Sequence, residues 1–253
     1  MTDFSSWCNS ETVVLVGDHA AGVLVANDEE CGINAVTATL PDRYAEAETL
    51  ARIADRFGKK GVGALLRKKA PESQRARSGD MGEILATAYL EEEMGYVVGP
   101  SRLIHRDHQE WAMRGDDVLG ARFDDGEVQL AKVEAKSRAS AGGAVIREAR
   151  AGLERENGLP SSHSLTQFAE RLFSTVDDRL GDAIMDLLLD AGVRPRRVTD
   201  VMFIFTGNDP SKHVRADLEA YMGSSRQKAV VLRVPAHQNF IRESFERALN
   251  SGA

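Results

Sequence analysis

The sequence has few of the features that would assign it to the membrane-spanning, secreted or zinc-binding classes. It contains only two cysteines, Cys8 and Cys31, and neither belongs to a CxxC motif or to a cysteine/histidine cluster. Two isolated cysteines indicate neither a disulfide framework nor a zinc site. No apolar run reaches the roughly 18 residues of a membrane span, and residues 1–10 have neither the basic nor the apolar region of a signal peptide. We therefore expect a cytoplasmic protein.

The chain also lacks an excess of positive charge, since its formal net charge is -7. Proteins that bind DNA on their own draw much of their affinity from basic side chains that neutralise phosphates, so the acidic balance argues against that class. Residues 59–77 are the exception, with one acid and seven basic residues: Lys59, Lys60, Arg67, Lys68, Lys69, Arg75 and Arg77. This basic strip is interpreted equally well as a nucleic-acid or partner contact and as a solvated helix face.

The order of predicted elements indicates an α/β fold. Residues 1–75 are expected to form an N-terminal lobe, with strands at 12–16 and 22–26, a helix at 41–56 and a break at 70–74. In residues 76–253 we expect a helix at about 81–94, a strand from 96, a β-hairpin, helices between 143 and 191, strands at 198–206 and 229–234, and a helix at 237–250. This order predicts a mixed central sheet with helices packed on it.

The hairpin carries the first candidate site residues. Asp125-Gly126 is the strongest short-range signal for a hairpin turn. If these two residues form the loop, the register places Asp117 across from Glu134 on one face of the sheet. Lys136, two residues further on, projects from that face as well. Two carboxylates and a lysine can hold a hard divalent cation beside a phosphodiester.

Each of these residues also has a plainer interpretation. Glu134 and Lys136 are also accounted for by a solvent-facing ion pair on a strand, and Asp116 and Asp117 by turn chemistry after Gly115. Between the two aspartates the register favours Asp117 as the ligand, because Asp116 would point through the sheet.

Glu83 is a candidate third acid in the helix that precedes the hairpin. A capping box with Asp80 as the N-cap and Glu83 three residues later would explain it equally. Gly82 favours a functional role, because glycine in a helix costs about 1 kcal/mol relative to alanine and is typical of a close backbone approach.

Together these motifs resemble the PD-(D/E)xK nuclease superfamily. More narrowly, Ser78-Gly-Asp-Met-Gly-Glu83, Arg114-Gly-Asp-Asp-Val-Leu-Gly120 and Glu134-Ala-Lys-Ser137 resemble the HamA family, effectors of bacterial Hachiman anti-phage defence. The resemblance covers roughly residues 78 to 138. One departure is that Asp116 stands where the superfamily name has proline.

The resemblance implies a restriction-endonuclease-like core and a set of roles for the site residues. Glu83, Asp117, Glu134 and Lys136 would be catalytic; Mg²⁺ or Mn²⁺ would be held by Asp117, Glu134, Glu83 or Asp116, with the Ala135 carbonyl as a further ligand. The implied activity is metal-dependent degradation of DNA, restrained by a HamB-type superfamily 2 helicase until aberrant DNA is sensed. The alternatives are a non-catalytic DNA-sensing or scaffold subunit and a stand-alone restriction or junction-resolving endonuclease.

Overall fold

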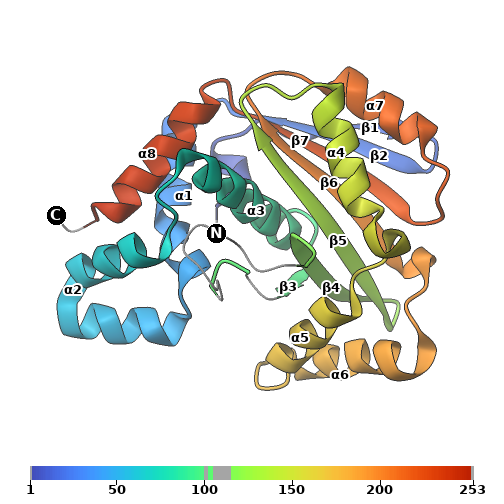
Figure 1. Cartoon of the computed structure of the whole chain (residues 1–253), viewed down its shortest axis with the longest axis horizontal. Coiled ribbons are helices and arrows are strands. Elements are labelled where there is room, and N and C mark those ends of the chain that lie inside the picture. The colour runs from blue at the N-terminus through green and yellow to red at the C-terminus, as the bar shows by residue number, and fades with distance from the viewer. Residues whose placement is uncertain (1, 100–101, 105–114, 252–253) are drawn as a thin grey trace.

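A computed structural model describes residues 2–99, 102–104 and 115–251. These residues form one mixed seven-stranded sheet with the strand order β1-β2-β7-β6-β5-β4-β3 (Figure 1). The strands are β1 Thr12–Val16, β2 His19–Val25, β3 Val97–Gly99, β4 Val118–Asp124, β5 Glu127–Arg138, β6 Val198–Thr206 and β7 Arg226–Arg233. The prediction of an α/β fold with a mixed central sheet is confirmed.

Helices cover both faces of this sheet (Figure 1). Eight α-helices occur in the described residues: α1 Glu29–Tyr44, α2 Ala47–Lys69, α3 Gln74–Glu92, α4 Gly143–Leu153, α5 Ser162–Leu172, α6 Asp178–Asp186, α7 Ser211–Ala220 and α8 His237–Leu249. Phe203 and Phe205 of β6 pack with α1, α3 and α8, whereas Met202 and Ile204 pack with α4 and α7. A strand buried on both faces reads as a continuous apolar run, which is why residues 198–206 were predictable.

The hairpin formed by β4 and β5 has the predicted register. Asp124 pairs with Glu127, and the two loop residues Asp125 and Gly126 have φ values of 50° and 80°, as the twist of a two-residue hairpin requires. The ladder ends at the pair Val118–Val133. From Glu134 onward, β5 is bonded to β6 but has no partner on its β4 side among the described residues. This leaves an open edge on the C-terminal part of β5, an interior strand of the sheet.

Two predicted helix boundaries are wrong. The helix expected at 41–56 is instead two helices, because α1 begins earlier, where the Asp28 side chain accepts a hydrogen bond from the Cys31 N–H. Pro41 lies in the last turn of α1 rather than in the first turn of a helix. The helix expected from Met81 begins at Gln74, with Ser73 as its N-cap, so Asp80 and Glu83 form no capping box. The predicted break at 70–74 is confirmed for residues 70–73, since α2 ends at Lys69 and α3 begins at Gln74.

The N-terminal strands belong to the same sheet as β5. β1 and β2 form an antiparallel pair, and β2 pairs in parallel with β7. Residues 12–25 therefore extend the main sheet beyond β7. Within the described part of the chain, no helix has the length and apolar character that crossing a membrane requires.

Candidate active site at the open end of strand β5

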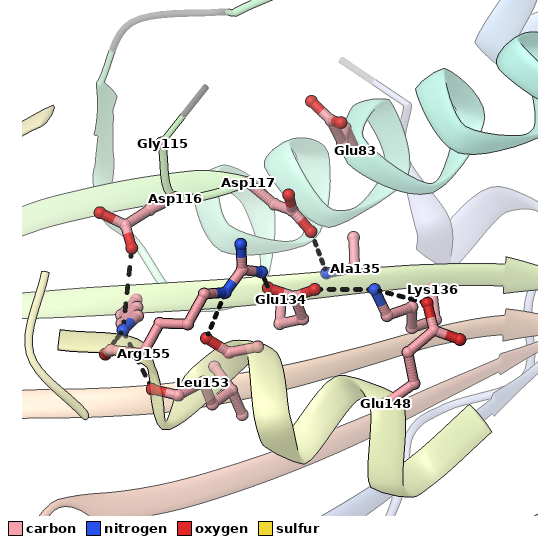
Figure 2. Close-up of polar contacts among 12 residues, drawn as sticks. Glu83, Gly115, Asp116, Asp117, Glu134, Ala135, Lys136, Glu148, Leu153 and Arg155 are labelled. Carbon is pink, nitrogen blue, oxygen red and sulfur yellow. Dashed lines mark hydrogen bonds and ion pairs between the residues drawn. The ribbon is translucent and has the colours of Figure 1, made fainter. Parts of the chain in front are cut away.

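Glu134 lies on the side of β5 that faces α4, and it is only 4% exposed. Its carboxylate fits there because residue 152 in α4 is glycine: a Cβ on Gly152 would lie 2.1 Å from Glu134 Cδ. Gly152 thus allows the helix to pass directly over the carboxylate (Figure 2). The glycine costs α4 some helix propensity, and the close approach accounts for that cost.

Two cations bind the Glu134 carboxylate. Lys136 Nζ donates to Glu134 Oε1 at 2.7 Å, and Arg155 Nη2, in the turn after α4, donates to Oε2 at 2.8 Å (Figure 2). Burial raises the pKa of Glu134 and the nearby charge of Asp117 raises it further, while the two cations oppose this shift. Lys136 also lies 3.2 Å from Glu148 Oε1. Burial disfavours the Lys136 ammonium, but the bond to Glu134 and the negative charges of Glu134, Asp117 and Glu148 together raise the pKa of the lysine.

Asp117 immediately precedes β4, and its side chain binds the main chain of β5 at the open edge. Its Oδ2 accepts a hydrogen bond from the Ala135 N–H at 3.0 Å, and its Oδ1 accepts one from Arg102 Nη2 at 2.9 Å. Because the ladder stops at Val118, Asp117 is not a ladder partner of Glu134. The charges of the two carboxylates nevertheless act on each other, as the raised pKa of Glu134 indicates.

Glu83 joins this group through Arg102. The same Arg102 Nη2 that binds Asp117 donates to Glu83 Oε1 at 2.8 Å. Burial raises the pKa of Glu83 to about 7; the Arg102 charge opposes the shift and Asp117 adds to it. Glu83 is in place because α3 lies close to β5 at Gly82, where a Cβ would lie 3.3 Å from Ser137 Cβ. The close approach expected at Gly82 is therefore confirmed.

Asp116 points to a different set of partners. Its Oδ2 accepts a hydrogen bond from the Ser161 N–H at 2.9 Å, and its Oδ1 lies 3.8 Å from Lys132 Nζ. Lys132 is buried and donates to three main-chain carbonyls, those of Leu153, Arg155 and Leu159. Asp116 thus ties the start of β4 to the chain that follows α4. Asp117 instead points to the Ala135 N–H (Figure 2) and also binds Arg102.

The donor chemistry of this group suits a hard divalent cation, but the positions of the carboxylates do not yet form a ligand set. Asp117, Glu134 and Glu83 offer the carboxylate oxygens that such ions prefer. In the part of the chain that the structure describes, no three histidine, cysteine or acidic side chains are close enough to hold a metal together. Arg102, Lys136 and Arg155 supply the positive charge instead. Binding of a cation would require Arg102 to release Asp117 or Arg155 to release Glu134.

Sequence patterns did not indicate four residues that shape this site: Arg102, Lys132, Gly152 and Arg155. The reasoning applied to Gly82 could also have predicted a close approach at Gly152, since both are glycines inside helices that approach a strand. The two arginines and Lys132 belong to no motif. Arg114, the first residue of the Arg-Gly-Asp-Asp motif, lies outside the described residues.

Comparison with known proteins places the chain in a family. Residues 3–248 match the family model described as HamA. A curated relative, the Hachiman protein HamA of Bacillus cereus, is 29% identical over 154 residues, which are 61% of this chain and 53% of the relative. The alignment therefore spans about half the length of that relative. Because the family match covers nearly all of the sequence, the chain belongs to the HamA family.

Proposed function

We propose that this chain is a metal-dependent deoxyribonuclease, the DNA-degrading effector of a bacterial anti-phage defence system. Membership of the HamA family and similarity to a Hachiman protein support the defence role. The observation that carries the nuclease proposal is the buried Glu134 paired with Lys136 at the open end of β5, with Asp117 bonded to the main chain between them. The element order α3, β3, β4, β5, α4, β6 agrees with the restriction-endonuclease-like core that the PD-(D/E)xK resemblance implies.

Asp117 and Glu134 would hold Mg²⁺ or Mn²⁺, with the Ala135 carbonyl and Glu83 as further oxygen donors. When bound, such an ion lowers the pKa of a coordinated water and stabilises the charge that develops on a phosphodiester under attack. The rise in pKa that Asp117 imposes on both Glu134 and Glu83 supports this assignment, because clustered carboxylates are relieved by added positive charge.

Lys136 would act on the phosphate itself. The Glu134 hydrogen bond orients its ammonium and keeps it protonated. A fixed cation beside a phosphodiester stabilises the additional negative charge of the transition state, and in a partly buried site it does so with little screening. Glu148, which is half-exposed, competes for the same ammonium and would have to yield to the substrate.

A partner would supply what the chain lacks in DNA affinity. The net charge of -7 makes non-specific binding to DNA weak. We therefore include in the proposal a HamB-type helicase that delivers DNA to the nuclease and restrains it until aberrant DNA is sensed. The ion pairs of Arg102 and Arg155 with the candidate ligands agree with a resting state that still needs to be activated.

The test is degradation of plasmid DNA by the purified chain, with and without the helicase and ATP, in Mg²⁺ and in chelator. We expect general degradation that requires Mg²⁺ and is lost in Asp117→Asn. The matched control is Asp182→Asn, an exposed aspartate on α6. Degradation that continues in chelator would contradict the proposal. No cleavage under any condition would favour a non-catalytic sensing subunit, and discrete products a stand-alone endonuclease.

A further inference from the structure

A cavity of about 460 Å³ lies where the end of β5 meets the first turns of α3 and the start of α8 (Figure 1). It is lined by Gln74, Arg75, Ser78, Ser137, Arg138, Ala139 and Gln238. We propose that this cavity binds a phosphate group of a nucleic-acid strand, next to the phosphodiester held at Lys136. The identity of the ligand as DNA rests on the proposed function, whereas the presence of a phosphate site does not.

The cavity is lined by uncharged hydrogen-bonding groups in fixed positions. Ser78 Oγ lies 2.8 Å from Ser137 Oγ, which in turn lies 3.1 Å from His237 Nε2. On the α8 side, Gln74 Nε2 donates to Gln238 Oε1 at 2.8 Å. Burial lowers the pKa of His237 to about 4, so the imidazole is neutral at physiological pH. Hydroxyl and amide groups that are already ordered bind an anion with little loss of side-chain entropy.

The charge at this cavity is positive. Two of its seven lining residues, Arg75 and Arg138, are basic and none is acidic. Arg75 is exposed and forms no ion pair with any residue that the structure describes. Arg138 donates to the Ser137 carbonyl at 2.9 Å and lies 3.5 Å from Glu148, at the outer limit of a hydrogen bond. The planar guanidinium group matches the geometry of phosphate oxygens.

The position of the cavity points to the backbone of the substrate. Arg138 lies two residues after Lys136 on β5 and projects from the same face, whereas Ser137 points to the opposite face and contacts Ser78 of α3. Glu148 is within 3.2 Å of Lys136 Nζ and 3.5 Å of Arg138 Nη2, so one carboxylate already reaches both cations. A phosphate in the cavity would thus be a near neighbour of the phosphodiester at Lys136. The N-terminal end of the α3 dipole adds further attraction for an anion, although the Ala76 N–H of this turn is bonded to the Ser73 hydroxyl.

This site also gives a partial answer for the basic strip of residues 59–77. Arg77 of that strip is used inside the protein, since its Nε donates to the Pro71 carbonyl at 2.8 Å and its guanidinium lies over the Phe245 ring. Arg75, two residues earlier, lines the cavity and is available to a ligand. Arg77 therefore has neither of the two roles that the sequence left open, while the proposal assigns the nucleic-acid contact to Arg75.

The test is DNA binding in chelator, where no hydrolysis occurs, measured by fluorescence anisotropy with labelled single strands carrying a 5′-phosphate or a 5′-hydroxyl. For the double variant Arg75→Gln/Arg138→Gln we expect the affinity for DNA to fall by up to about tenfold. The salt dependence of binding should decrease by about one phosphate contact. Arg215→Gln, an exposed arginine on α7, is the matched control and should bind as the wild type does. Thermal melts of every variant establish that it is folded.

The outcomes separate the sources of the phosphate. If the double variant loses the preference for a 5′-phosphate, the cavity takes a strand end; if it weakens both strands equally, it takes an internal phosphodiester. Equal binding by the wild type and the double variant overturns the inference, as does failure of the wild type to bind DNA and to be stabilised thermally by inorganic phosphate. Because binding is measured without metal, a failed nuclease assay leaves this result unaffected.

Discussion

Lys132 and Lys136 lie four residues apart on the same face of β5, yet their surroundings give them different roles. Lys132 is enclosed by three carbonyls and Asp116, and burial lowers its pKa. Among the described residues, Lys136 forms ion pairs with the carboxylates of Glu134 and Glu148, and its bond to Glu134 raises its pKa. The hydrogen bonds of the Lys132 ammonium are taken up by main-chain carbonyls of the protein, whereas the partners of Lys136 are side chains at an open strand end. The ladder boundary at Val118 thus lies between a lysine held by main-chain carbonyls and the lysine that the proposed function assigns to the substrate.

Removing the charge of Lys132 should have the largest effect, and it should be on stability. Lys132→Met removes the ion-pair partner of Asp116 and the hydrogen-bond donor to three main-chain carbonyls. Loss of one partner of a buried ion pair costs about 3–5 kcal/mol, which we expect as the decrease in the free energy of unfolding. Urea denaturation measures it, with Lys212→Met on the surface of α7 as the control. A variant as stable as the wild type would show that Lys132 does not hold the chain after α4.

Lys136→Met should instead act on catalysis. We expect the rate of Mg²⁺-dependent DNA degradation to fall by about 100-fold or more, the effect typical of removing one group that stabilises transition-state charge. The free energy of unfolding should fall less than in Lys132→Met, because Arg155 still binds the buried Glu134 carboxylate. Lys136→Arg keeps the charge and should retain more activity than the methionine variant. A large loss of stability in Lys136→Met would erase the contrast with Lys132.

Gly152→Ala should affect both quantities, but less. The new Cβ would meet the Glu134 carboxylate at 2.1 Å, so either the helix or the carboxylate must shift. Overpacking of this kind costs about 1–3 kcal/mol, and moving Glu134 should also reduce activity. Gly79→Ala, in α3, is the control, because nothing lies within 4 Å of its Cβ. That substitution should be neutral or stabilise the helix by up to about 1 kcal/mol. Equal results for the two glycines would contradict the packing of Glu134 against α4.

The smallest expected effect is a pH dependence of stability from Glu83. Its pKa in the folded protein is about 7, raised mainly by burial from an ordinary value of 4.5. Between these two pH values the folded state binds more protons than the unfolded state, so the free energy of unfolding decreases as pH rises through this window. In chelator, Glu83→Gln should make the decrease shallower than in the wild type, and the surface variant Glu127→Gln should not. Melting temperatures of the wild type and both variants across this pH range measure the effect, and an unchanged slope in Glu83→Gln would contradict it.

The elements of the fold that could be predicted from the sequence are those determined by a local residue pattern. The hairpin followed from Asp125-Gly126, and β6 from its uninterrupted apolar run. Helix starts were less predictable, because Asp80 and Glu83 satisfy the capping pattern, whereas Ser73 is the actual N-cap and both acids lie in the interior of α3. The partners of the acids were not predictable at all. Arg102 and Arg155 reach Asp117, Glu83 and Glu134 only through the folding of segments that carry no periodic signal.

The most direct test of the central assignment compares two glutamates on the same strand. Glu134→Gln removes the buried carboxylate at the open end of β5, and Glu127→Gln removes one at its start, where Arg197 is the partner. The rate of plasmid degradation in Mg²⁺, with the helicase and ATP present, should fall by about 100-fold or more in the first variant and stay at the wild-type level in the second. Equal rates in both folded variants would contradict the assignment of Glu134 to the catalytic site.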